Sequence, residues 1–255
     1  MKSKLPKHRI TIVPRQLINS YELNLQRKLE SIWKSVKADA IKRLKAEYKE
    51  AYIPMNVNSA GKPYRNDIFT ALYAAKKQSA IATTNYISRQ MQRNVSGTFF
   101  NEKIIPTIQE RSFLITDKNI LPGMENRLKD ALIQGMKQGA TLAQLTDKLD
   151  MLQGNFTTIA RTETHSAAAE AGFDVATNEL NIIGGLNLFK KGWQTADDEK
   201  VRDSHQDAGQ DYGDGNEIDM DDEFELADDS VMFPGEYGKA PEEVINCRCN
   251  YYITH

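Results

Sequence analysis

The chain has 255 residues, a formal net charge of −2 and a hydrophobic fraction of 40%, a composition typical of a globular protein of one or two domains. No run of roughly 7–15 apolar residues follows the N-terminus, and no window approaches the ~18 needed to cross a bilayer, so we predict neither a secretory signal nor a membrane segment. The two cysteines, Cys247 and Cys249, exclude a disulfide framework because a bridge across one residue would be strained. We therefore expect synthesis in a reducing cytosol.

Charge is unevenly distributed along the chain. The first 50 residues carry 13 Lys and Arg against 5 Asp and Glu, whereas residues 193–243 carry 18 acidic against 3 basic residues. A basic segment can approach nucleic acid or an acidic protein face, while an acidic stretch repels polyanions. The candidate contacts for such a partner are the basic side chains near the N-terminus, namely Lys2, Lys4, Lys7, Arg9, Arg15, Arg27 and Lys28.

The first two predicted elements are an arm and a long helix. Residues 1–16 are basic and contain Pro6 and Pro14, which predicts an extended arm. Residues 17–50 repeat apolar side chains at three- and four-residue steps, which is typical of an amphipathic helix. The repeating positions are Leu17, Tyr21, Leu25, Leu29, Trp33, Val36, Ala40 and Leu44. This helix either packs on its own domain or docks on a partner or DNA.

The middle of the chain predicts further helices separated by breaks. Residues 54–63 contain the turn formers of a loop, and Asp67 can cap a helix that runs to about residue 92. Residues 99–121 fit either a helix or a strand, and Pro106 and Pro122 limit the length of both. Residues 124–138 predict a helix that Gly139 ends, and Thr141 begins the next one.

A long helix is predicted from residue 159 to about 180, capped by Thr157 or Thr158. Its centre is rich in small residues, with alanine at 167–169 and 171 and glycine at 172. Small side chains let another backbone approach closely, which predicts a tightly packed, buried helix. The alternative is that the alanines only reflect high helix propensity.

The last 70 residues change in character. Residues 186–195 are typical of a strand, residues 201–208 of a short helix capped by Asp197 or Asp198, and residues 210–230 of an acidic loop. A turn follows at 231–235 and a strand at 244–254. We therefore predict an α+β protein with three parts: a basic arm at 1–16, a helical N-terminal domain at 17–150, and a small mixed α/β C-terminal domain at 151–255.

The spacing of Cys247 and Cys249 suggests a metal site. On a strand, side chains two residues apart point to one face, so both thiols would face the same way. With His205 and one further ligand they can form a tetrahedral zinc site. A pair of buried, small apolar thiols is the alternative, and it is favoured because zinc sites more often place two residues between cysteines. We expect no cofactor other than a structural zinc.

Arg161-Thr162-Glu163 opens the predicted long helix. Arg161 and His165 lie one helical turn apart and share a face, whereas Glu163 points elsewhere. The cluster fits either a structural ion-pair network or a catalytic Glu/Arg pair. The structural interpretation is favoured because no nucleotide-binding motif surrounds it.

An ordered set of motifs resembles the phage-Mu-F-like minor head proteins, the head morphogenesis proteins of tailed phages. The similarity covers about residues 125–252, and the order and spacing of its motifs match those of the family. Its members are Ile159-Ala160-Arg161-Thr162-Glu163, Trp193-Gln194-Thr195, Asp198, Val201-Arg202, Ser204-His205, Phe233-Pro234-Gly235 and Val244-Ile245-Asn246-Cys247-Arg248-Cys249. The chain departs from the family at Ala208-Gly209, where members often have Asp-Gly.

The resemblance implies a low-copy protein of the capsid interior, assembled in the host cytoplasm near or on the portal vertex. Its implied partners are the portal protein, the capsid interior and packaged DNA, and its implied roles are head assembly and DNA packaging, retention or ejection. The motif residues would brace the C-terminal domain: Arg161, Thr162, Glu163, Trp193, Asp198, Arg202, His205, Cys247, Arg248 and Cys249. Some family members carry fused enzymatic toxin domains; since the chain ends six residues after Cys249, we expect none here.

An enzyme is the competing interpretation. A metal-dependent hydrolase or nuclease would use His205, the two cysteines and nearby carboxylates. An ADP-ribosyl transferase would be built on Arg161 and Glu163. We predict that the chain is not an enzyme.

Overall fold

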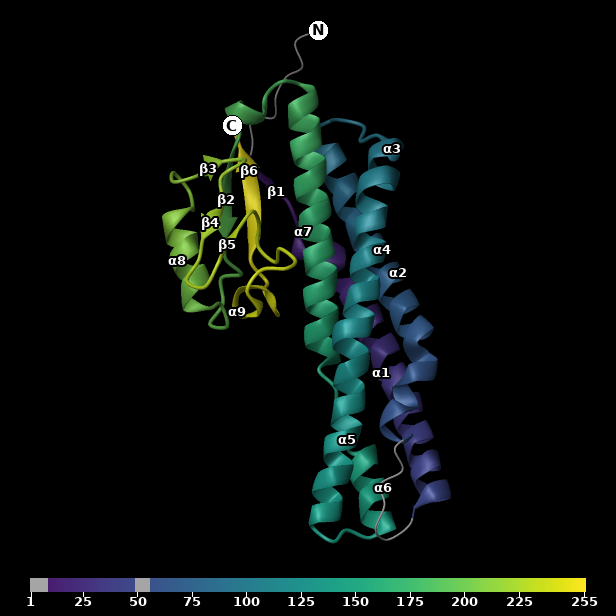
Figure 1. Cartoon of the computed structure of the whole chain (residues 1–255). Helices are drawn as coiled ribbons and strands as arrows, with labels where there is room; N and C mark the ends of the chain where they lie inside the picture. The colour runs from purple at the N-terminus through teal and green to yellow at the C-terminus, as the bar shows by residue number, and fades with distance from the viewer. Residues whose placement is uncertain (1–8, 49–55) are drawn as a thin grey trace. The chain divides into compact units, whose positions relative to one another are not determined.

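The computed structural model describes residues 9–48 and 56–255 and confirms the α+β class, with many helices and a small antiparallel sheet (Figure 1). The α-helices are α1 Arg15–Glu47, α2 Arg65–Gln90, α3 Gly97–Phe99, α4 Ile105–Ile115, α5 Leu121–Lys137, α6 Leu142–Asp150, α7 Phe156–Ile182, α8 Asp203–Asp211 and α9 Pro241–Val244. Among these residues, no helix combines the length and apolarity needed to cross a membrane. Lys2, Lys4 and Lys7 lie outside the described ranges.

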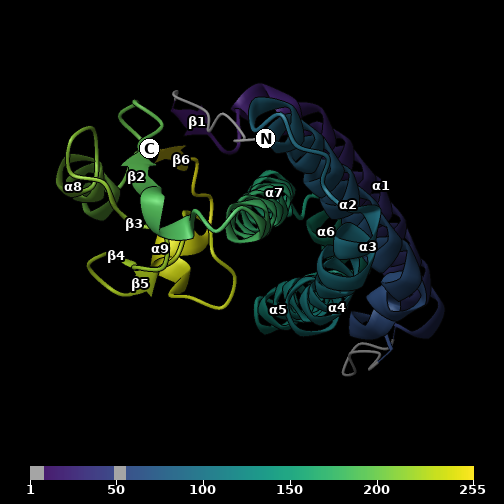
Figure 2. The ribbon, with the colours of Figure 1, turned by 90° about the horizontal axis from the view of Figure 1, so that it is seen from above.

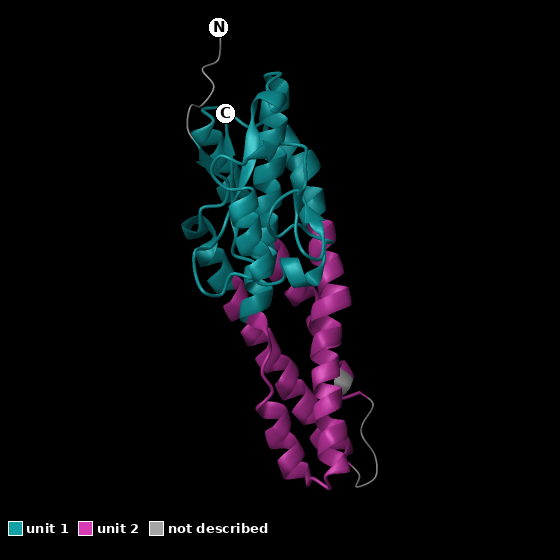
Figure 3. Cartoon of the chain, turned by 90° about the vertical axis from the view of Figure 1, so that its left-hand side faces the viewer, with its two compact units in different colours: residues 1–24, 74–108, 157–255 teal, residues 25–73, 109–156 magenta. Residues whose placement is uncertain are grey.

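The chain divides into two compact units (Figure 3). Unit 1 contains residues 1–24, 74–108 and 157–255, and unit 2 contains residues 25–73 and 109–156. This division differs from the expected boundary near residue 150, because it cuts α1, α2, α4 and α7 and not only the loops between helices. A 33-residue helix such as α1 is about 50 Å long, so its two ends can belong to different cores.

Unit 2 is helical, and the predicted apolar stripe of α1 supplies much of its core. Leu25, Leu29, Trp33 and three further stripe positions, Val36, Ala40 and Leu44, are at most 4% exposed. The indole N–H of Trp33 donates a hydrogen bond to the carbonyl of Leu152 over 3.1 Å. The periodicity therefore identified a buried face. Leu17 and Tyr21, which belong to unit 1, are only half-buried.

The ambiguous region at 99–121 is helical. Two π-helical stretches, η2 Phe100–Ile104 and η3 Thr116–Ile120, link α3, α4 and α5 into one helical run. Each stretch ends two residues before a proline, Pro106 or Pro122. A π-helical turn shifts the backbone hydrogen-bonding register, so the missing proline N–H and the proline ring are tolerated where an α-helix would break. Composition alone does not reveal such a local adjustment.

Helix starts were predicted unevenly. Thr141 caps α6 as expected and forms a capping box with Gln144, and Gly139 precedes it with a φ of 68°. The predicted caps of three other helices were wrong. Asp67 lies in the first turn of α2, and α8 begins after Arg202, one turn beyond Asp198. Thr157 and Thr158 lie in the first turn of α7, which begins at Phe156. The loop predicted before α2 contains the 3₁₀ helix η1 Asn58–Tyr64.

The sheet of unit 1 joins the two ends of the chain. Its order is β1 Ile10–Thr11, β6 Asn250–Thr254, β2 Lys190–Gln194 and β3 Ile218–Asp219, and each neighbouring pair is antiparallel. It lies between α7 and α8 in both Figure 1 and Figure 2. Within the arm predicted at 1–16, residues 10–11 form β1, which pairs with β6, and α1 begins at Arg15.

The acidic stretch is more ordered than expected. β3 lies within it, and β4 Phe224–Glu225 pairs with β5 Ser230–Val231 in a two-stranded sheet. The strand predicted at 244–254 is confirmed only from residue 250, because α9 and a turn occupy its first half. Buried apolar residues explain the order of the stretch, since Met220, Phe224 and Val231 are at most 2% exposed.

The small residues of α7 are buried, as the tight-packing prediction requires. Ala167, Ala168, Ala169 and Ala171 are at most 3% exposed. A Cβ placed on Gly172 would lie 2.3 Å from Cγ2 of the buried Ile12 and 3.1 Å from Cγ2 of Thr83. The absence of a side chain at Gly172 therefore allows the segment leading into α1 to approach α7 closely.

Gly172→Ala is expected to destabilise the protein by about 1–3 kcal/mol, because the added methyl overpacks a closed contact. Urea unfolding followed by circular dichroism measures the change. Gly123→Ala is the control, since no atom lies within 4 Å of its added Cβ in α5. That change should stabilise by up to about 1 kcal/mol through helix propensity. Equal responses at both positions would contradict the packing at Gly172.

Candidate metal centre

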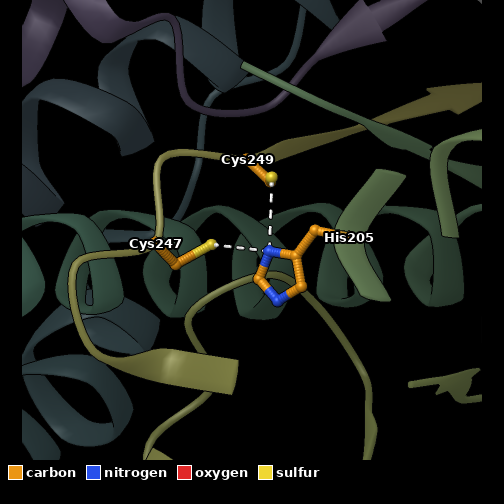
Figure 4. Close-up of side chains that lie close together, drawn as sticks. All are labelled: His205, Cys247 and Cys249. Carbon is orange, nitrogen blue, oxygen red and sulfur yellow. Dashed lines mark hydrogen bonds between the residues drawn. The ribbon is translucent and has the colours of Figure 1, made fainter. Parts of the chain in front are cut away.

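Three potential metal ligands converge in unit 1 (Figure 4). Nδ1 of His205 lies 3.7 Å from Sγ of Cys247 and 3.4 Å from Sγ of Cys249. The three ligand atoms lie within 4.8 Å of one another, and the three residues are only 1–2% exposed. This is the one group of its kind found among the residues described. The structure thus brings together residues that are 42 and 44 positions apart.

The cysteines do not lie on a strand, which corrects the basis of the sequence argument. They occupy the irregular segment between α9 and β6, while His205 lies on α8. Asn246, with a φ of 60°, redirects the chain just before them. Its backbone N–H donates to Oγ1 of Thr162 over 2.8 Å, and its side chain accepts from Arg161 over 2.8 Å. Two motif residues of α7 therefore position the segment that carries the thiols.

Glu243 contacts the opposite edge of the imidazole, and sequence reasoning missed it. Its Oε2 lies 2.9 Å from Nε2 of His205, although without the alignment of an N–H···O hydrogen bond. The carboxylate also accepts from the Ser204 hydroxyl over 2.8 Å and from the backbone N–H of Asp228 over 3.3 Å. A carboxylate beside Nε2 favours the proton on that nitrogen, which leaves the Nδ1 lone pair facing the thiols. No sequence signal separates Glu243 from the other acidic residues around it.

The two thiols differ in acidity. A hydrogen bond with Cys247, followed by one with His205, lowers the pKa of Cys249 to about 5. The hydrogen bond with Cys249, together with burial, raises the pKa of Cys247 well above its usual value. Thiolate and imidazole are the ligands that zinc prefers, so the cluster has the donors of a zinc site.

Arg161 and Glu163 contact different partners. The Nε–H of Arg161 donates to Oε1 of Glu22 over 3.1 Å, on α1. Glu163 forms a buried ion pair with Lys76 of α2, with 2.7 Å between Nζ and Oε2. They therefore belong to two separate ion pairs and not to one network. Lys76 and Glu22 carried no sequence signal as partners, because the pairs span 87 and 139 residues.

The other motif residues surround the cysteine segment. Arg248 forms a bidentate ion pair with Asp198, which lowers the pKa of that carboxyl to about 2. Arg202 donates to the carbonyl of Ile245. Trp193, on β2, is 2% exposed and packs edge-on against His205, with 5.1 Å between ring centroids. These contacts hold α8, β2 and the cysteine segment together.

A cavity of about 440 Å³ lies beside the centre, within unit 1. Its lining includes Arg15, Arg161, His165 and Cys247. His165 is buried, and desolvation lowers its pKa to about 4, so its side chain is neutral at physiological pH. Because Cys247 lines the cavity, the cavity gives solvent a route toward that side of the cluster.

The basic candidates of the N-terminal segment have different environments. Arg9 pairs with Asp214 of the acidic stretch and stacks over the Tyr252 ring at 3.4 Å. Arg15 is exposed at the cavity, and Arg27 and Lys28 are exposed on α1. Arg9 is thus partly neutralised by the chain itself, whereas the other three present their charge to solvent.

Comparison with known proteins supplies the family. The family described as "Phage Mu protein F like protein" matches residues 123–252, which include every motif residue above. The chain belongs to this family. It is therefore a phage head-morphogenesis protein, as the resemblance implied.

One similar protein carries an enzyme name. The NAD(+)--arginine ADP-ribosyltransferase EFV of Enterococcus faecalis (strain ATCC 700802 / V583) is 29% identical over 168 residues. The match covers 65% of the phage chain and 30% of that relative, so most of the relative lies outside the similarity. No solved structure shows a significant match.

Proposed function

We propose that this phage head-morphogenesis protein is a minor head protein of the capsid interior near the portal vertex, with a role in DNA packaging, retention or ejection and no turnover of its own. The family match over residues 123–252 is the observation that carries the proposal. Its partners are the portal protein, the capsid interior and packaged DNA, and it assembles in the host cytoplasm.

The environment of the motif residues supports a bracing role. Glu163 is 7% exposed and ion-paired with Lys76, and His205 is 1% exposed. An enzyme needs its acid, base or metal ligand to reach a substrate. Here these groups contact the chain's own side chains, as expected of groups that stabilise a fold.

Purified heads test the proposal. We expect the protein in procapsids and virions at far fewer copies than the major capsid protein, and we expect it to cross-link to the portal protein. A phage that lacks the protein should give particles defective in DNA content or delivery. Particles from which the protein is absent, or fully infective particles made without it, would contradict the proposal.

Salt dependence separates the two candidate partners. A DNA contact through the basic segment releases counterions, so log affinity falls with log salt by about 0.9 per phosphate neutralised on duplex DNA. The portal contact is measured with purified portal at the same salt concentrations. DNA binding that is absent even at low salt excludes the DNA contact and leaves the portal.

An ADP-ribosyl transferase is the second candidate, because the similar protein from E. faecalis bears that name. It would use Arg161 and Glu163 and require NAD⁺. Incubation of the protein with labelled NAD⁺ and arginine tests it directly. Transfer that is lost in folded Glu163→Gln would favour this candidate over the bracing role.

A further inference from the structure

We propose that His205, Cys247 and Cys249 bind one zinc ion that ties α8 to the segment before β6. The inference concerns the stability of unit 1 and does not rest on the head role. The three residues come from two parts of the chain, and their donor atoms converge in a buried position.

The distances agree with a shared metal. With Zn–S bonds of about 2.3 Å and Zn–N bonds of about 2.0–2.1 Å, a tetrahedral geometry places sulfur and nitrogen about 3.5–3.6 Å apart. The two observed Nδ1 to Sγ separations are 3.4 and 3.7 Å. The two nitrogen-to-sulfur separations therefore match the spacing that a tetrahedral zinc ion requires.

One zinc ion would account for the approach of both thiols to the same ring nitrogen. With its proton on Nε2, beside Glu243, the imidazole has a single lone pair at Nδ1, and only one S–H can donate to it. A zinc ion at the centre uses that lone pair and both thiolates together. Zinc binding releases the thiol protons to solvent, and no electron is transferred.

The carboxylate of Glu243 completes the arrangement. A histidine that binds a metal usually has a carboxylate, carbonyl or water at its other ring nitrogen, which fixes the ring and raises its basicity. Glu243 occupies that place and is itself held by Ser204 and the backbone of Asp228. It is a positioning residue and does not bind the metal.

The site is suited to a structural ion. Three side-chain donors converge among the described residues, so we assign the fourth position to a solvent oxygen from the cavity beside Cys247. The ligands are too deeply buried for a large substrate to reach them. The ion would close a loop of more than 40 residues, and such links stabilise a fold by restricting the unfolded chain.

Metal analysis of the full chain, purified under reducing conditions, tests the proposal. We expect one zinc per chain in the wild type and loss of zinc in Cys247→Ser, Cys249→Ser and His205→Gln. His255→Gln is the control, because this exposed histidine lies outside the cluster and its loss should leave zinc stoichiometric. Glu243→Gln should weaken zinc affinity about 10–100-fold without abolishing it.

Two measurements on the wild type remain valid even where a ligand variant does not fold. Removal of zinc by a chelator should lower the melting temperature by roughly 5–10 °C, and zinc should restore it. X-ray absorption should show two sulfur ligands and two lighter ones, and cobalt should give the thiolate charge-transfer bands of a tetrahedral site. Protein without zinc and without a cobalt spectrum, or a metal held by four sulfurs from two chains, would overturn the proposal.

Discussion

Trp193→Ala is expected to lower the free energy of unfolding by about 3–5 kcal/mol, among the largest effects of any single substitution in this chain. The indole is 2% exposed and lies edge-on to His205 and to Phe224, with ring centroids 5.1 and 5.3 Å away. Truncation to alanine removes these contacts and leaves a cavity between α8, β2 and β4. Urea unfolding monitored by circular dichroism measures the loss.

Two further variants make this result specific. The indole N–H has no hydrogen-bond partner among the described residues, so Trp193→Phe loses volume without losing a hydrogen bond. We expect it to cost less than about 1.5 kcal/mol. Leu188→Ala removes a 52% exposed apolar side chain of the same unit and should change stability by less than about 0.5 kcal/mol. If Trp193→Ala behaved like Leu188→Ala, the buried position of Trp193 would be wrong.

Lys76→Met should destabilise the protein by about 3–5 kcal/mol, because it leaves the Glu163 carboxylate buried without its cation. The side chains of Lys76 and Glu163 are 2% and 9% exposed, and they join α2 to α7. The cost arises from desolvation of an unpaired charge and not from the strength of the ion pair itself. Equilibrium denaturation of the single variants measures it.

The double variant separates these two contributions. Lys76→Met combined with Glu163→Leu removes both charges and should recover most of the loss, since replacing a buried ion pair by apolar groups is often neutral or stabilising. The partly exposed pair of Lys239 and Glu223 is the control, and Lys239→Met should cost no more than about 1 kcal/mol. A double variant as unstable as the single one would indicate that the two residues do not depend on each other.

Much of the helical framework was predictable because it depends on neighbouring residues. The period of α1 identified its buried face, the Thr141 cap and Gly139 located the boundary between α5 and α6, and the small residues of α7 indicated close packing. The predictions failed where a local signal was ambiguous. Prolines 106 and 122 suggested breaks, but π-helical turns absorb them, and β6 begins six residues later than its composition suggested.

The candidate site was predictable in its members but not in its construction. His205, Cys247 and Cys249 stood out because few residue types bind zinc and the chain has only two cysteines. Glu243 did not stand out, since it is one of the 18 acidic residues within residues 193–243. Its role depends on α9 placing it against α8, a contact that spans 38 residues.

By itself, the sequence determined the helical periodicity, the α+β class and the ordered motifs of the family, because each is a property of residue types at short spacing. Only the tertiary structure decided that β1 pairs with β6, that Glu163 meets Lys76 while Arg161 meets Glu22, and that Glu243 contacts His205. These contacts join residues 38 or more positions apart. Their formation depends on the path of the whole chain, which no local pattern of side chains records.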